Sequence, residues 1–171
     1  MLRTCSVALL CACAALSTLP AGHAQAQSTA ATATGSMLTV NQPLPTLRLT
    51  DQHNQVWQLP THTRLVLFAA GRKAANVVQS VLAKEPPDFL LQHSAVYVVD
   101  MSKMPAFATR MFALPALREM PFRVGVSMDE AVLAGWPRQP DAVTLIELTQ
   151  GTVTHIGHVH TESELRTALA R

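Results

Sequence analysis

Cysteine is lacking from most of the sequence, because the three cysteines of this 171-residue chain are Cys5, Cys11 and Cys13. The remainder of the chain can form no disulfide, and it offers no thiolate as a metal ligand or as a nucleophile. Chemistry that depends on thiol–disulfide exchange is therefore excluded from residues 14–171.

The first residues are typical of a secretory signal peptide. Arg3 precedes an apolar run over residues 7–19, and small residues lead to an A-x-A-like cleavage pattern at 24–26. The apolar run is shorter than the roughly 20 residues that a membrane-spanning helix needs, which disfavours a transmembrane anchor. A lipid anchor at Cys13 is disfavoured as well, because the apolar run before it is too short. We expect cleavage and export.

No later segment is apolar over a length that could span a bilayer. The sequence predicts a signal peptide over residues 1–26, a flexible linker over 27–36 and one domain over 37–171. That last segment is long enough to bury one hydrophobic core. The mature protein is expected in the periplasm, with no membrane span.

A strong excess of charge of either sign is also lacking. The chain has 13 basic and 11 acidic residues, and removal of the signal peptide takes away only the basic Arg3. A nearly balanced charge provides no long-range attraction to nucleic acid or to an anionic membrane. The sequence has no G-x-S-x-G, Walker or G-x-G-x-x-G pattern, and its carboxylates form no obvious acid/base pair.

Alternating strand and helix patterns are present instead. The sequence predicts a β-hairpin, then a strand, helix, strand, Met-rich helix and short strand, and finally a second hairpin and a helix. Their expected positions are 47–59, 64–70, 74–82, 95–99, 105–119, 122–129, 141–160 and 162–170. Thr161 and Glu164 are spaced as a capping box for the last helix. We therefore expect an α/β domain with a central mixed sheet flanked by helices.

The order of these elements resembles the thioredoxin fold, in its exported and peroxiredoxin-related branch. Strands 64–70 and 95–99 flank a helix, and a right-handed crossover makes them parallel neighbours. The opening "LPTLRLTDQHNQVWQL" also resembles the P-x-x-x-L-x-D-x-x-G pattern that begins such domains. The resemblance covers nearly all of residues 43–170 and implies a thioredoxin-like fold with an N-terminal β-hairpin.

The redox motif of that fold is missing. Where thioredoxin-like proteins carry Cys-x-x-Cys, this sequence has "AGRKAAN", and Asp141-Ala142 falls where they carry a cis-proline. The junction "AAGRKAAN" and the later "AVTLIELTQGTV" and "TESEL" are similar to the cysteine-free exported proteins of the YtfJ kind. This resemblance implies compartment and fold, and it implies no dithiol reductase, isomerase or peroxidase activity.

The strand-to-helix junction supplies the candidate ligand-binding residues. They are Arg72, Lys73, Asn76, Asp100 and Asp141. Two cations and free N–H groups at a helix start can bind an anion or a partner peptide. Alternatively, Arg72 pairs with Asp100 across two adjacent parallel strands, with Asp141 as a third member, or the charges are simply solvated. The ion pair is the expectation we favour.

Histidine and methionine offer weaker candidates for metal binding. His158 and His160 share one face of a strand, while His155 points to the other. Two imidazoles can share Zn²⁺ or Cu²⁺, but no third ligand is identifiable. The many methionines suit Cu(I), yet flexible core filling explains them as well. We predict no metal site and no cofactor.

Two functions from different classes remain. The first is a non-catalytic thioredoxin-fold module that binds a periplasmic protein or a small anion. The alternative is an oxidoreductase that works through a bound flavin or metal and uses Arg72, Lys73 and Asp100 as its polar groups.

Overall fold

A central mixed sheet of seven strands organises residues 37–170, the part of the chain that this computed structural model describes. The predicted signal peptide and linker lie outside the described residues. The strands are β1 (Leu49–Thr50), β2 (Val56–Trp57), β3 (Leu65–Ala69), β4 (Ala95–Asp100), β5 (Val124–Ser127), β6 (Val143–Thr149) and β7 (Thr152–Val159). Their spatial order is β2-β1-β5-β4-β3-β6-β7.

The three central strands are parallel, as the sequence predicted for the first two of them. Leu65 of β3 lies opposite Ala95 of β4, and β5 runs parallel to β4 on its other side. The β1–β2 and β6–β7 hairpins extend the sheet antiparallel on either side. Because the carboxyl ends of parallel strands meet at one edge of a sheet, the chain segments after β3, β4 and β5 share that edge.

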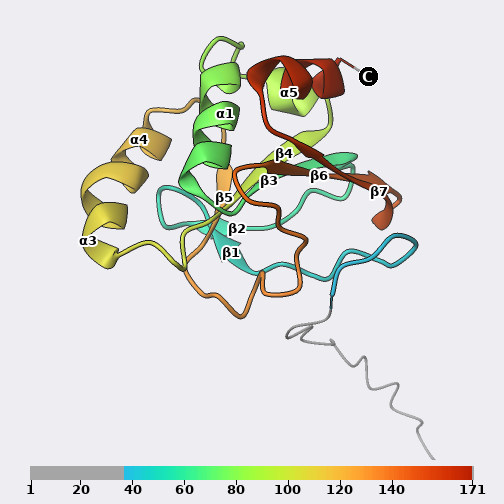
Figure 1. Cartoon of the computed structure of the whole chain (residues 1–171), viewed down its shortest axis with the longest axis horizontal. Helices are drawn as coiled ribbons and strands as arrows, with labels where there is room; N and C mark the ends of the chain where they lie inside the picture. Colours follow the sequence, from blue (N-terminus) through green and yellow to red (C-terminus); the bar gives the residue numbers. More distant parts are fainter. Residues whose placement is uncertain (1–36, 171) are drawn as a thin grey trace, which may run out of the picture. The chain divides into compact units, whose positions relative to one another are not determined.

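Helices cover one face of the sheet (Figure 1). The helical segments are α1 (Arg72–Leu82), α2 (Phe89–Gln92), α3 (Ala106–Ala108), a π-helical turn η1 (Thr109–Ala113), α4 (Leu114–Arg118) and α5 (Glu162–Leu169). α1 and α5 bury their apolar faces on this side, as their periodicity predicted. The short α2 was not anticipated, because four residues carry too little periodicity to be recognised.

The opposite face of the sheet is covered mainly by chain segments without regular structure. Its core contains Phe68 and Val98 from the central strands, together with Leu133 and Trp136 from the long segment between β5 and β6. Side chains alternate along a strand, so Ala69 and Val99 point instead to the helical face. This alternation decides which polar groups can meet at the carboxyl edge.

The predicted capping box of α5 is present. The Thr161 hydroxyl accepts a hydrogen bond from the Glu164 N–H, and the Glu164 carboxylate accepts one from the Thr161 N–H. We expect Thr161→Ala to lower the free energy of unfolding by about 1 kcal/mol, because the cap satisfies a helix N–H that is otherwise left without a partner. Urea unfolding measures this loss. Thr154→Ala, at an exposed position of β7, is the matched control, and an equal loss in both variants would contradict the capping role.

Only part of the expectation that methionine fills the core is correct. Met101 is buried in the helical-face core, but Met111 and Met128 are about half exposed or more. In the Met-rich stretch, the exposed Phe107 and Phe112 contact each other edge to face. A π-helical turn, η1, interrupts the α-helical register in the middle of the predicted helix.

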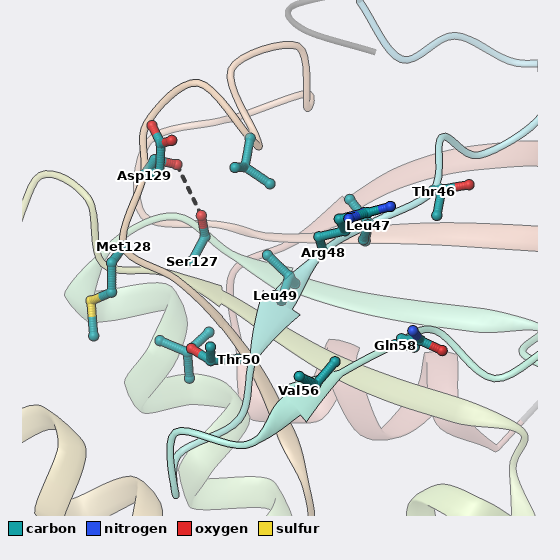
Figure 2. Close-up of a pocket in the computed structure, with 12 residues that line it drawn as sticks. Thr46, Leu47, Arg48, Leu49, Thr50, Val56, Gln58, Ser127, Met128 and Asp129 are labelled. Carbon is teal, nitrogen blue, oxygen red and sulfur yellow. Dashed lines mark hydrogen bonds between the residues drawn. The ribbon is translucent and has the colours of Figure 1, made fainter. Parts of the chain in front are cut away.

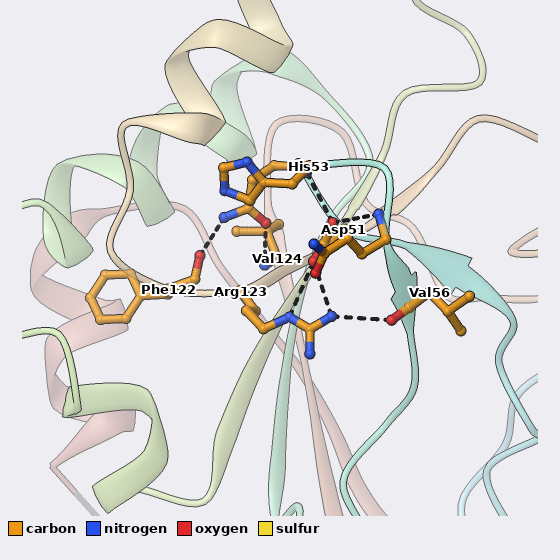
Figure 3. A network of polar contacts seen from close by, with 8 residues as sticks. Asp51, His53, Val56, Phe122, Arg123 and Val124 are labelled. Carbon is orange, nitrogen blue, oxygen red and sulfur yellow. Dashed lines mark hydrogen bonds and ion pairs between the residues drawn. The ribbon is translucent and has the colours of Figure 1, made fainter.

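A buried carboxylate fixes the loop between β1 and β2 (Figure 3). Asp51 Oδ1 accepts hydrogen bonds from the backbone N–H groups of His53 and Gln55, at 2.9 and 2.8 Å. Its Oδ2 accepts from Nε and Nη2 of Arg123, at 3.1 and 3.0 Å. Burial alone would raise the pKa of Asp51, but the hydrogen bonds from Gln55, Arg123 and His53 outweigh it and lower this pKa below its ordinary value.

The neighbouring Gln52 joins the hairpin to β5. Its side-chain amide donates to the Phe122 carbonyl and accepts from the Val124 N–H. Among the residues described, β1 and β5 are paired at one position, Thr50 with Val126. In an antiparallel ladder hydrogen-bonded pairs recur at every second residue, so the next one on this side would be Gln52 with Val124, and the Gln52 side chain takes the place of that backbone pair.

Candidate functional site

The start of α1 is the junction that the sequence singled out. Gly71 is the N-cap residue and provides no side-chain cap, and the first turn carries no acidic residue. Arg72, Lys73 and Asn76 are all exposed. No side chain caps the first-turn N–H groups, and the two cations lie where the helix dipole disfavours positive charge. An anion at this position would relieve that repulsion.

Lys73 contacts Asp141, which lies two residues before the start of β6. Lys73 Nζ lies 2.6 Å from Asp141 Oδ2, and the side chains are 73% and 56% exposed. Exposed pairs of this kind contribute about 0–1 kcal/mol, so an incoming anion can compete for the lysine at little cost. Asp141 also has a left-handed backbone, with φ of 60°. The pair joins the site where thioredoxin-like proteins carry Cys-x-x-Cys to the site where they carry a cis-proline. It does not include Asp100.

The structure contradicts the expected ion pair between Arg72 and Asp100. Asp100 instead contacts Arg138, with Arg138 Nη1 2.6 Å from Asp100 Oδ2. Arg72 makes no ion pair with any residue from 37 to 170. Strand alternation explains the error: Asp100 follows Val98 by two residues and so points to the non-helical face, whereas α1 packs on the other face.

The Asp100–Arg138 pair is mostly buried. The Asp100 side chain is 1% exposed and that of Arg138 is 25% exposed. Arg138 Nη2 donates to the Leu133 carbonyl at 2.7 Å, and its guanidinium lies 5.5 Å from the centroid of the Phe68 ring. Trp136 packs edge-on against the same ring. Arg138 is therefore held by an ion pair, a hydrogen bond and a cation–π contact.

Sequence reasoning missed Arg138 because no periodic signal marks it. It lies in an irregular segment between β5 and β6, and its partner Asp100 is far away in the sequence. Only a general rule pointed towards it, namely that a carboxylate ending a buried strand needs a cationic partner. That rule does not say which arginine of the chain supplies the charge.

The histidines in and just after β7 do not gather into a metal site among the residues that the structure describes. No group of three or more histidine, cysteine, aspartate or glutamate side chains is placed to hold a metal ion within residues 37–170. The His158 ring lies 3.2 Å from the Thr144 hydroxyl. Partial burial lowers the pKa of His158, and the charge of His160 lowers it further.

Comparison with known proteins bears on the fold. No protein-family model matches the chain, and no curated protein is detectably similar to it in sequence. Solved structures do match. A peroxidoxin, BcpB, from Mycobacterium tuberculosis is 13% identical with a TM-score of 0.52, covering 78% of this chain and 95% of that one.

Two further structures agree. A thio-disulfide isomerase from Thermus thermophilus is 17% identical with a TM-score of 0.50, over 78% of this chain and 96% of that one. A thioredoxin-like protein from Porphyromonas gingivalis is 12% identical with a TM-score of 0.50, over 77% of this chain and 92% of that one. The chain therefore has a thioredoxin-like fold, as the order of its elements predicted.

Among residues 37–170, no helix has both the length and the apolar character needed to cross a membrane.

Proposed function

We propose that this protein is an exported thioredoxin-fold module that binds a periplasmic protein or a small anion at the start of α1, without dithiol redox chemistry. One observation carries the proposal. The strand-to-helix junction of a thioredoxin-like fold is occupied here by Gly71, Arg72 and Lys73, and not by cysteines. The junction therefore offers positive charge at the place where thioredoxin-like redox proteins carry a cysteine nucleophile.

Three features of the junction support binding of an anion. The first-turn N–H groups have no side-chain cap, Arg72 has no ionic partner among the described residues, and Lys73 has only an exposed one. A carboxylate or phosphate group fits both the charge and the donors. The N-terminal sequence supports export, and the lack of cysteine after residue 13 supports a module without dithiol chemistry.

The absence of redox chemistry is tested by insulin reduction. With dithiothreitol as the electron source, the mature protein is expected to match the blank without protein, because no thiol can relay electrons. A cysteine-containing thioredoxin is the positive control. Turnover above the blank would refute this part of the proposal.

Anion binding at the junction is tested with inorganic phosphate and acetate as probes. We expect the double variant Arg72→Gln/Lys73→Gln to weaken binding about tenfold or more, because charge-assisted hydrogen bonds are lost. Lys84→Gln is the matched control, since it removes one exposed cation just beyond the other end of α1. Chemical shifts of backbone amides over residues 71–76 measure binding. Equal affinity in the double variant and the control would refute the site.

A further inference from the structure

A groove opens where β1 and β5 part (Figure 2). The two strands are in register only at Thr50 and Val126. On one side of this pair the Gln52 side chain continues the ladder, as described above. On the other side, hydrogen-bonded pairs would recur at every second residue, so the next one would be Arg48 with Met128, and that pair is not formed. Both of these residues line the groove, which has a volume of about 570 Å³.

Part of the backbone in this groove lacks a backbone partner. Within residues 37–170, the N–H and C=O groups of Thr46, Leu47, Arg48 and Met128 take part in no backbone hydrogen bond. Unpaired main-chain groups next to an existing ladder are what an added strand recognises. An extended chain is the ligand that can satisfy several of them together.

The side chains of the groove add an apolar floor and two opposite charges. Val56 is 73% exposed and Met128 is 49% exposed, so both leave apolar surface uncovered. Arg48 lies on the β1 side, and Asp129 lies on the segment that follows β5. Neither side chain forms an ion pair with another residue in the range 37–170. Their complement is a ligand that has apolar groups between an acid and a base.

We propose that this groove binds an extended peptide segment in which apolar side chains lie between an acidic and a basic residue. The peptide backbone pairs with Thr46 and Arg48, its apolar side chains cover Val56 and Met128, its acid faces Arg48 and its base faces Asp129. A small carboxylate would satisfy Arg48 alone and would leave the backbone groups unpaired. The groove makes no use of the α1 start, so this inference does not depend on the proposed function.

The test uses the mature protein and a blocked hexapeptide, Glu-Val-Thr-Val-Thr-Lys. We expect saturable amide shifts at residues 46–48 and at Met128 at millimolar peptide or below. A matched peptide with glutamine in place of glutamate and lysine should bind about fivefold or more weakly, because its charges are removed. Hexanoate is the probe for a small apolar carboxylate.

Variants of the protein localise the contact. Arg48→Gln should weaken binding of the hexapeptide about fivefold, whereas Arg64→Gln, at an exposed arginine just before β3, should not change it. Val56→Gln should weaken binding, and Leu91→Gln, at another exposed apolar position, should not. The inference is overturned if saturable shifts are absent, if they fall at residues 71–76 and not in the groove, if hexanoate reproduces them, or if Arg48→Gln binds as tightly as the unaltered protein.

Discussion

Replacement of Arg138 by methionine is expected to lower the free energy of unfolding by about 3 kcal/mol, the largest effect of any substitution proposed for this protein. The reason lies with its partner. The Asp100 side chain is 1% exposed, and without Arg138 it keeps, within residues 37–170, just the hydrogen bond from the Ser102 N–H. A buried carboxylate without a cation is costly, whereas methionine keeps much of the packing over Phe68. Urea unfolding at neutral pH measures the loss.

Arg72→Met is the matched control for this substitution. Arg72 is exposed at the start of α1 and makes no ion pair within residues 37–170, so its replacement should change stability by no more than about 0.5 kcal/mol. A double-mutant cycle separates the two arginines. Asp100→Asn should couple to Arg138→Met by about 1 kcal/mol or more and should be additive with Arg72→Met. Coupling of Asp100→Asn to Arg72→Met, with additivity towards Arg138→Met, would instead support the Arg72–Asp100 pair that the sequence suggested.

Asp51→Asn is expected to cost about 2 kcal/mol at pH 7, the second largest effect. The Asp51 carboxylate accepts two backbone hydrogen bonds and two from Arg123, while its side chain is only 1% exposed. Asparagine has one acceptor oxygen, and its NH₂ group would face the donors of Arg123 or of the loop. The β1–β2 hairpin would lose part of its attachment to β5. Chemical unfolding of the two proteins measures the difference.

The pH dependence of this loss follows from the lowered pKa of Asp51. Because the folded-state pKa lies below the unfolded value of about 3.9, the stabilisation is fully present above that value. It is lost as the pH falls through the folded-state pKa. The gap in stability between the unaltered protein and Asp51→Asn should therefore narrow in acid. Asp129→Asn, at an exposed aspartate, is the control and should show no comparable gap at pH 7.

Local patterns predicted most of the secondary structure. The continuous apolar run of β3 and the helical spacing of Ala74, Val78 and Val81 are properties of short segments, and the structure confirms both elements. The capping box of α5 needs only two residues at fixed spacing. The π-helical turn η1 was missed because no local residue pattern distinguishes it from an α-helix.

The candidate site was predicted less well than the fold. The position of Arg72 and Lys73 at the start of α1 is confirmed, since it depends only on where a strand ends and a helix begins. The partner of Asp100 was wrong, because it depends on the face to which one side chain points and on the path of a long irregular segment. The pairing of Lys73 with Asp141 likewise joins residues that only the folded chain brings together.

The sequence by itself determined that thiol chemistry is excluded after residue 13 and that the parallel strands β3 and β4 flank α1, because composition and periodicity are local properties of the chain. Only the tertiary structure decided that Arg138 neutralises Asp100, that Gln52 continues the β1–β5 ladder, and that the ladder stops before Arg48 and Met128. Each of these depends on contacts between segments far apart in the sequence. Such contacts are fixed by packing of the whole sheet, and no local pattern encodes them.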